Sequence, residues 1–284
     1  MTTEIKRKKL TGERALYRSE HLYIQDTIFE DGESPLKESR DISLYRCMFK
    51  WKYPLWYGQD IVADNCTFFE MGRAGIWYTD QISVKNSLFE APKAFRRCRG
   101  VNIENVDFVK ADETLWNCSD VSMDDVTAKG DYFAMNSTDM RISNLELVGN
   151  YPFDGGRDIT IDSSRLMSKD AFWNCENVTV KNSFISGEYI GWNSRGLTFE
   201  NCIIESLQGF CYIDGLVMRN CTLLNTTLAF EYSSVDIEVN GMVDSVKNPL
   251  GGRIVCDGID ELILDPDAVD VSKTEMVYRD AEDV

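Results

Sequence analysis

Three consecutive stretches of the chain decide its fold. They read ITIDSSRLMSKDAFWNCEN (159–177), VTVKNSFISGEYIGWNSRG (178–196) and LTFENCIIESLQGFCYIDG (197–215). Each stretch opens with alternating apolar and polar residues, as in Val178 and Val180 or Leu197 and Phe199. This alternation is typical of a half-buried strand rather than of a helix. A copy of 19 residues cannot bury its own apolar face, so successive copies must stack on one another.

The same copy recurs along nearly the whole chain, in steps of 19 to 21 residues. Further copies start near Leu22 and at Ile42, Ile61, Ile82, Val101, Val121, Met140, Leu216, Val235 and Ile254. Three short strands in each copy leave no room for a helix of useful length. The repeat therefore predicts an all-β, single-stranded parallel β-helix solenoid of about 12 coils of about 19 residues. We expect the right-handed form, because left-handed β-helices usually repeat in hexads.

The fifth position of the copies predicts how the coils turn. It holds Asn65, Asn86, Asn105, Asp125, Asn144, Ser163, Asn182, Asn201 and Asn220. Asn tolerates the left-handed backbone of a tight turn, and its amide both donates and accepts hydrogen bonds. Stacked at the spacing of the coils, these side chains can bond to one another in a ladder.

The repeat also predicts the domain organisation. No linker or change of composition interrupts residues 22–264, so we expect one β-helix there. Both ends of a β-helix expose unpaired strand edges and need covering. We expect residues 1–21 to form an N-terminal cap, and residues 265–284 to form a C-terminal cap and acidic tail.

Composition excludes several classes of partner. A net charge of −17 argues against nucleic acid and against anionic membranes, since both require a basic surface. The opening residues MTTEIKRKKL are followed by no apolar run, so we expect neither a signal peptide nor a membrane anchor. The nine Cys then indicate reduced thiols in a cytoplasmic protein. His21 is the only His and no CxxC spacing occurs, so we expect no metal and no cofactor.

The third segment of each copy carries two adjacent positions rich in aromatic and charged residues. The first holds Trp56, Trp77, Arg96, Trp116, Trp173 and Trp192, and the second holds Lys37, Tyr57, Tyr78 and Arg97. Alternation places the first position outside, but it leaves open which way the second faces. For Trp173 and Trp192 we favour a place in the core, where an aromatic stack would fill space.

The N-terminal coils are the candidate site, because both charge signs and aromatic residues concentrate there. The candidate catalytic residues are Glu33, Lys37, Glu38 and Arg97, and the candidate substrate-binding residues are Trp56, Tyr57, Trp77, Tyr78 and Arg96. Aromatic rings stack on the apolar faces of sugars, while charged groups fix hydroxyl or acid groups. Two carboxylates about 5–10 Å apart would suit glycoside hydrolysis. A Lys, Arg and Tyr set would instead suit proton abstraction beside a uronic-acid carboxylate. A solvated network of ion pairs is the alternative.

Three N-terminal motifs carry a resemblance to a known family. They are GERAL (12–16), GESPLKES (32–39) and YPLWY (53–57). With them the chain resembles the uncharacterised bacterial domain-of-unknown-function family 3737 along its whole length. The resemblance implies a pectin-lyase-like right-handed β-helix in a bacterial, cytoplasmic protein, and it supplies no catalytic residues. The NTD, DD, GHG and RIK segments of pectin-degrading glycosidases do not occur in that order.

Two functional hypotheses follow from these observations. The first is a carbohydrate-active or carbohydrate-binding protein that holds a sugar or uronic-acid ligand on the N-terminal coils. The second is a non-catalytic scaffold or protein-interaction rod that uses the same aromatic face. Whether the protein is an enzyme stays open at this point, since fold alone does not decide function.

Overall fold

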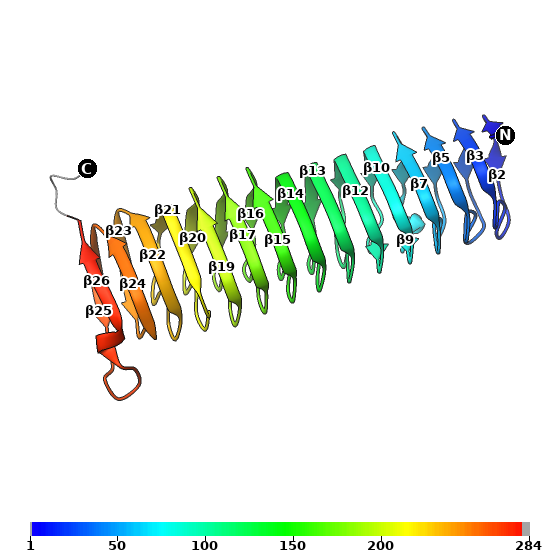
Figure 1. Cartoon of the computed structure of the whole chain (residues 1–284). Helices are drawn as coiled ribbons and strands as arrows, with labels where there is room; N and C mark the ends of the chain where they lie inside the picture. Colours follow the sequence, from blue (N-terminus) through cyan, green and yellow to red (C-terminus); the bar gives the residue numbers. More distant parts are fainter. Residues whose placement is uncertain (1, 280–284) are drawn as a thin grey trace. The chain divides into compact units, whose positions relative to one another are not determined.

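The computed structural model describes residues 2–279, and these are almost entirely β-structure and turns (Figure 1). The chain forms a parallel β-solenoid of about 15 turns of about 19 residues, which confirms the predicted fold class and exceeds the expected 12 coils. Two single-turn 3₁₀ helices interrupt it, η1 (Glu70–Gly72) and η2 (Val271–Lys273). Within residues 2–279 no helix is long and apolar enough to cross a membrane.

The coils group into two compact units, Met1–Glu146 and Leu147–Val284. The strands of the first unit are β1 (Thr3–Lys6), β2 (Lys9–Leu10), β3 (Glu20–Gln25), β4 (Ile28–Phe29), β5 (Arg40–Tyr45), β6 (Met48–Phe49), β7 (Gln59–Asp64), β8 (Thr67–Phe68), β9 (Ile76–Trp77), β10 (Asp80–Phe89), β11 (Phe95–Arg96), β12 (Arg99–Phe108) and β13 (Ser119–Lys129). Strand β14 (Thr138–Val148) contains the division. One side of this unit is a parallel ladder of β1, β3, β5, β7, β10, β12 and β13, each pairing with its equivalent one coil away.

The second unit repeats the same arrangement. Its strands are β15 (Arg157–Asp162), β16 (Arg165–Met167), β17 (Glu176–Lys181), β18 (Phe184–Gly187), β19 (Arg195–Glu200), β20 (Ile203–Ser206), β21 (Leu216–Leu224), β22 (Ser234–Asn240), β23 (Met242–Lys247), β24 (Gly251–Cys256), β25 (Gly258–Ile263) and β26 (Thr274–Tyr278). Here β15, β17, β19, β21, β22, β24 and β26 form the first ladder, and β16, β18, β20 and β21 form the second.

The third side of the coils differs from the expected third strand. In the first unit it pairs as a strand mainly in the two-residue β9 and β11. Elsewhere it consists of turns whose backbone groups still bond to the next coil. The N–H of Leu55 donates to the carbonyl of Gly75 at 2.8 Å, for example, and the N–H of Tyr57 donates to that of Trp77 at 2.9 Å. This side is therefore also hydrogen-bonded from coil to coil, but its turns allow consecutive side chains to point outward.

Inward-facing residues of equivalent coils make the core. The clearest column in the first unit is Phe29, Phe49, Phe68, Phe89 and Phe108, with successive ring centroids 4.8, 4.7, 4.3 and 4.9 Å apart. All five rings are buried. Because each ring is held by the coil before and the coil after, the stack ties the register of one coil to that of the next.

The Asn corners confirm the predicted turn. All nine residues of the fifth position have a φ between 49° and 55°. The amide of Asn201 donates to Asn182 at 3.0 Å, and that of Asn220 donates to Asn201 at 2.8 Å. These ladder side chains are exposed to solvent. Water can therefore replace a lost partner, and the backbone conformation is the larger reason for Asn at this corner.

We expect Asn182→Ala to lower the free energy of unfolding by about 1 kcal/mol, because Ala at φ 50° bears the left-handed strain that Asn tolerates. Asn182→Gly removes the same amide without that strain, so it should stay close to the native value. Urea denaturation of the three proteins measures the difference. Equal losses in both variants would instead assign the stability to the amide ladder.

The coils extend further toward both ends than expected. Strands β1 and β2, inside the expected cap of residues 1–21, pair with β3 and β4 and complete the first coil. Strand β26, inside the expected C-terminal cap and tail of residues 265–284, pairs with β24. The expected acidic tail lies partly outside the described residues, at 280–284. The added coils account for the larger number of turns.

All nine cysteines are free and buried. Cys47, Cys66, Cys202 and Cys221 occupy one repeat position and line the interior, as small core residues do. Burial raises the pKa of Cys175 and of Cys211 to about 12. Cys175 and Cys211 are therefore protonated and unreactive at neutral pH. Among residues 2–279 no three His, Cys, Asp or Glu side chains come together to hold a metal ion.

Candidate functional site

Both aromatic positions of the third side face outward in the N-terminal coils. The residues before them, Leu55 and Ile76, are buried. The second aromatic position then takes a left-handed backbone, with φ 54° at Tyr57, 58° at Tyr78 and 51° at Arg97. This turn interrupts the alternation, so two consecutive side chains point away from the core. The sequence pattern left open which way the second position faces, and the left-handed backbone turns it outward.

The first position forms a Trp–Arg column of Trp56, Trp77, Arg96 and Trp116. The indoles of Trp56 and Trp77 stack with centroids 5.1 Å apart and planes at 7°. The guanidinium of Arg96 lies between two indoles, 4.4 Å from Trp77 and 4.6 Å from Trp116. It also donates to Glu113 at 3.0 Å. The ring faces and the cation are already engaged with each other, so this column is a rigid support rather than a stacking platform.

The second position forms a Tyr column of Tyr57, Tyr78 and Arg97. The preceding coil has Glu38 at this position and not the expected Lys37, because the N–H of Glu38 donates to the carbonyl of Trp56 as that of Tyr57 does to Trp77, and both residues are left-handed. Lys37 lies level with Trp56 and reaches the column from the side. The two phenol rings stack at 4.8 Å with planes at 5°. Lys37 covers the outer face of Tyr57 at 5.5 Å, and Arg97 covers that of Tyr78 at 5.8 Å. Tyr57 is nevertheless 48% exposed. With the other phenol on one face and a cation near the other, each ring presents mainly its edge and hydroxyl group to solvent.

The candidate carboxylates are each held by a cation of their own. Lys52 binds Glu33 at 3.0 Å. Arg18 binds Glu38 at 2.7 Å and the hydroxyl of Tyr17 donates to it at 2.9 Å. The hydrogen bond from Arg18, followed by that from Tyr17, lowers the pKa of Glu38. Glu38 is therefore ionised at neutral pH and poorly suited to donate a proton.

The structure thus joins some of the candidate residues and separates others. Lys37 and Arg97 meet the aromatic residues directly, whereas the carboxylate of Glu38 binds Arg18, with Lys37 at 3.8 Å. Glu33 pairs with Lys52 instead. Among residues 2–279 the guanidinium of Arg97 has no carboxylate partner, whereas that of the adjacent Arg96 has Glu113. In a protein of net charge −17, an exposed and unpaired Arg is available for an anion.

The preference for Trp173 and Trp192 in the core is wrong. Both side chains are half-buried on the outer side of their coils, while Phe172 and Ile190 occupy the interior. The indole N–H of Trp173 donates to the carbonyl of Tyr189 at 2.6 Å. The same turn that exposes Tyr57 operates here, because the residue after Trp173 is an Asn with left-handed backbone.

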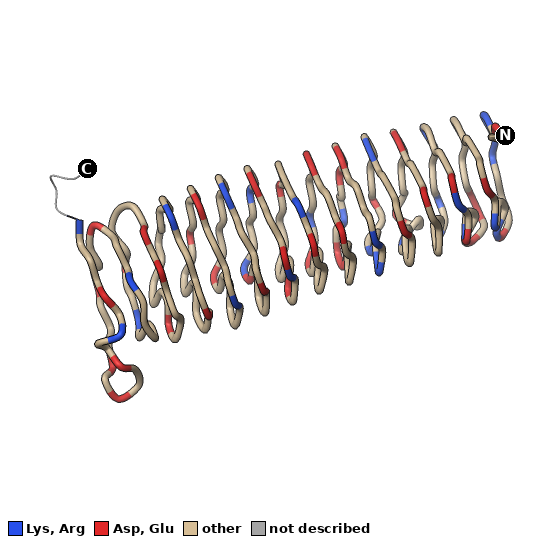
Figure 2. The backbone as a smooth tube through the Cα atoms, in the orientation of Figure 1, with Lys and Arg blue, Asp and Glu red and all other residues tan. Residues whose placement is uncertain are grey.

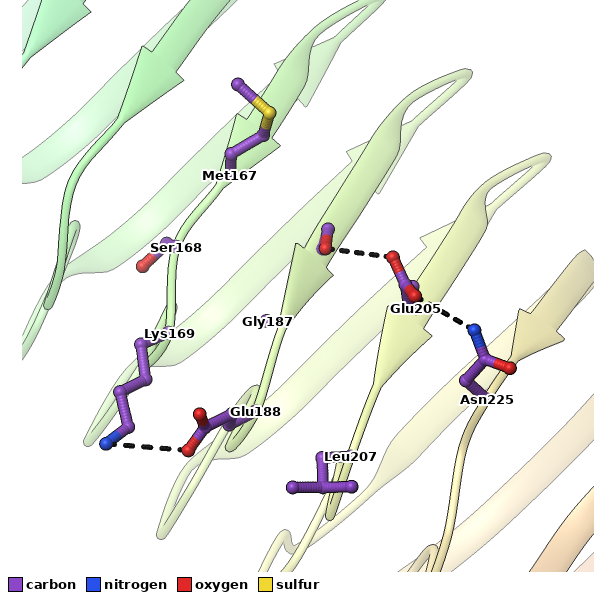
Figure 3. A pocket seen from close by; sticks show the side chains of 9 residues that line it. Met167, Ser168, Lys169, Gly187, Glu188, Glu205, Leu207 and Asn225 are labelled. Carbon is purple, nitrogen blue, oxygen red and sulfur yellow. Dashed lines mark hydrogen bonds and ion pairs between the residues drawn. The ribbon is translucent and has the colours of Figure 1, made fainter.

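A recess in the second unit was not predicted from the sequence. It measures about 480 Å³ and is lined by Met167, Ser168, Lys169, Ser186, Gly187, Glu188, Glu205, Leu207 and Asn225 (Figure 3). Glu205 accepts from Ser186 at 3.1 Å and from Asn225 at 2.9 Å, and Lys169 lies 3.4 Å from Glu188. Each of these three charged groups therefore already has a partner within the recess. Opposite charges at one repeat position, Lys169 and Glu188, are the sequence signal that marks it.

Comparison with known proteins gives a family. The profile of the family described as "Protein of unknown function (DUF3737)" matches residues 3–277. The chain belongs to this family. The resemblance of the N-terminal motifs is thereby confirmed along the whole solenoid, and no curated protein matches the chain.

Solved structures similar to this family member are distant. The A-module of the Azotobacter vinelandii mannuronan C-5 epimerase AlgE4 is 8% identical, with 99% of this chain and 90% of that chain covered and a TM-score of 0.32. PfbA, a surface adhesin of Streptococcus pneumoniae, is 11% identical over 87% of this chain and 68% of that chain, with a TM-score of 0.27. QnrB1, a plasmid-mediated fluoroquinolone resistance protein, is 15% identical over 79% and 92%, with a TM-score of 0.22. At this distance they carry no argument about function.

Proposed function

We propose that this protein binds an acidic glycan, one that contains uronic acid, along the Tyr column of its N-terminal coils. The observation that carries the proposal is the pair of stacked, solvent-accessible phenols ended by two cations, of which Arg97 has no carboxylate partner within residues 2–279. The support is geometric: the column is already ordered before any ligand arrives, so little conformational freedom is lost on binding.

The chemistry of the column favours an acidic sugar over a neutral one. The planar guanidinium of Arg97 can donate two parallel hydrogen bonds to one carboxylate. The hydroxyls of Tyr57 and Tyr78 each donate and accept, as sugar hydroxyls do. Their rings lie 4.8 Å apart on consecutive coils, so a linear chain of sugars along the column meets a phenol on each of two coils.

The ion pairs favour binding rather than hydrolysis. A glycoside hydrolase needs one protonated carboxyl group and one carboxylate on either side of the scissile bond. Glu38 has a lowered pKa and Glu33 is paired with Lys52, so neither is arranged as a proton donor. Glu38 and Glu33 then serve as the partners of Arg18 and Lys52 rather than as catalytic groups.

We expect Arg97→Gln to weaken binding of an oligouronate at least about tenfold, since a hydrogen-bonded charged partner contributes about 1.5–3 kcal/mol. Isothermal titration calorimetry with oligouronates, and with the neutral oligosaccharides of the same linkage, measures the loss. The melting temperature should change little, because Arg97 is exposed.

Arg99→Gln is the matched control. Arg99 is exposed, lies on the same coil and carries the same charge, but it stands at the start of β12 outside the column. It should bind oligouronates as the native protein does. Equal losses of affinity in the two variants would show that net charge alone causes the effect. A native protein that binds no oligouronate would contradict the proposal and favour the non-catalytic scaffold.

A further inference from the structure

We propose that two copies of this protein associate head to tail, with β26 of one copy pairing in parallel with β1 of the other. The occupant of each open strand edge is thus a second copy of the same chain. This association is independent of any glycan on the Tyr column, since β1 and β26 lie outside it.

Both edge strands carry unused hydrogen-bonding groups. Within residues 2–279, β1 pairs only with β3 and β26 pairs only with β24. The outer side of each strand therefore presents a row of free backbone N–H and C=O groups, which is a template for another strand. Natural β-proteins cover such edges, and here the described residues leave these two open.

The core is also unfinished at both edges, at the same repeat position. Ile5 is level with Ile24, and Met276 is level with Ile254. Ile24 and Ile254 are fully buried, whereas Ile5 and Met276 are only half-buried. Pairing of β26 with β1 in the register of the ladder would set Met276 against Ile5 and bury both, as every internal coil does.

The repeat dictates that the contact is heterologous. Inside each unit, one coil always presents its C-terminal edge to the N-terminal edge of the next coil. The edge of β26 is therefore complementary to the edge of β1, not to a second β26. A contact of this kind leaves a free β1 on one copy and a free β26 on the other, so association continues beyond two copies.

The charges at the two ends are opposite. Residues 6–9 read Lys-Arg-Lys-Lys, while residues 257–270 contain six acidic residues and no Lys or Arg (Figure 2). Among residues 2–279, Arg7 and Lys8 have no carboxylate partner, and Asp260 and Glu261 have no cation. This complementarity steers one end of a copy toward the other end of its neighbour.

One like-charge contact opposes this arrangement and is offset locally. In the proposed register Glu4 comes level with Glu275. Each already has a cation beside it, Lys6 at 2.9 Å from Glu4 and Arg253 at 3.5 Å from Glu275. The repulsion between the two carboxylates is therefore screened by their own partners.

Sedimentation velocity of the full chain over a range of protein concentrations tests the proposal. We expect particles larger than a dimer at low ionic strength and high concentration, and a shift toward monomers at about 1 M salt, where the Debye length falls to about 3 Å. The double variant Arg7→Glu/Lys8→Glu and the double variant Asp260→Lys/Glu261→Lys should each associate at least about tenfold more weakly.

Mixing the two variants distinguishes head-to-tail pairing from a symmetric dimer. The native acidic end of the first variant complements the native basic end of the second, and the two charge-reversed ends complement each other, so the mixture should again form particles larger than a dimer, whereas a symmetric contact would stop at two copies. Lys129→Glu/Arg141→Glu is the matched control, because both residues are exposed and lie away from β1 and β26, and it should associate like the native chain. Monomers under all conditions, or dimers unaffected by either end variant, would overturn the proposal.

Discussion

We expect Phe68→Ala to lower the free energy of unfolding by about 3–5 kcal/mol, because a fully buried ring would be replaced by a cavity. The ring of Phe68 lies 4.7 Å from that of Phe49 and 4.3 Å from that of Phe89, so its removal also ends a stack between two coils. Urea denaturation followed by circular dichroism measures the loss.

Phe69→Ala is the matched control, since the adjacent ring points outward. Phe69 is half-buried, and its only described ring contact is with Lys50 at 5.9 Å. Its removal should cost about 1 kcal/mol or less. Similar losses from Phe68→Ala and Phe69→Ala would show that the stacked column does not dominate the core.

Gly187→Ala should lower the free energy of unfolding by about 3 kcal/mol, because there is no room for a side chain at this position. Its Cβ would lie 2.1 Å from the carbonyl oxygen of Ser168 on the preceding coil. Backbone cannot rotate away as a side chain can, so the two coils would have to separate locally. Thermal and urea denaturation should both show the loss.

Gly215→Ala separates this contact from backbone strain. Gly215 has a φ of 75°, but a Cβ there would meet nothing closer than 4.0 Å. The free energy of unfolding of this variant should fall only by the strain of a left-handed Ala, about 1–2 kcal/mol. A Gly187→Ala variant more stable than Gly215→Ala would contradict the close approach of the two coils.

The fold was predictable because its signal repeats. Alternation at Val178 and Val180 is weak evidence in one copy, but the same pattern in successive copies of 19 residues leaves only a stacked solenoid. The left-handed corners were predictable for the same reason, since Asn at this position in seven of nine copies has one common cause. The third strand expected in each copy was wrong over much of the first unit, because turns replace it there, and the coils reach further toward both ends than expected.

The candidate site was only partly predictable. Repeat position placed Tyr57, Tyr78 and Arg97 in one column, as the structure has them, but it was wrong for Lys37, because Glu38 occupies that position and Lys37 only reaches the ring of Tyr57 from beside it. Their direction could not be deduced, because a left-handed residue reverses the alternation that strand patterns rely on. The partners of the carboxylates could not be predicted either, since Arg18 and Glu38 lie 20 residues apart and meet only once the coils stack.

The buried thiols can report where the solenoid opens locally. Each cysteine is sealed between neighbouring coils, so a thiol reagent can reach it only when those coils part. The nine positions, from Cys47 to Cys256, sample both units at intervals along the chain. The order in which they become reactive would therefore trace where a stack of coils begins to unravel, without any label being added to the protein.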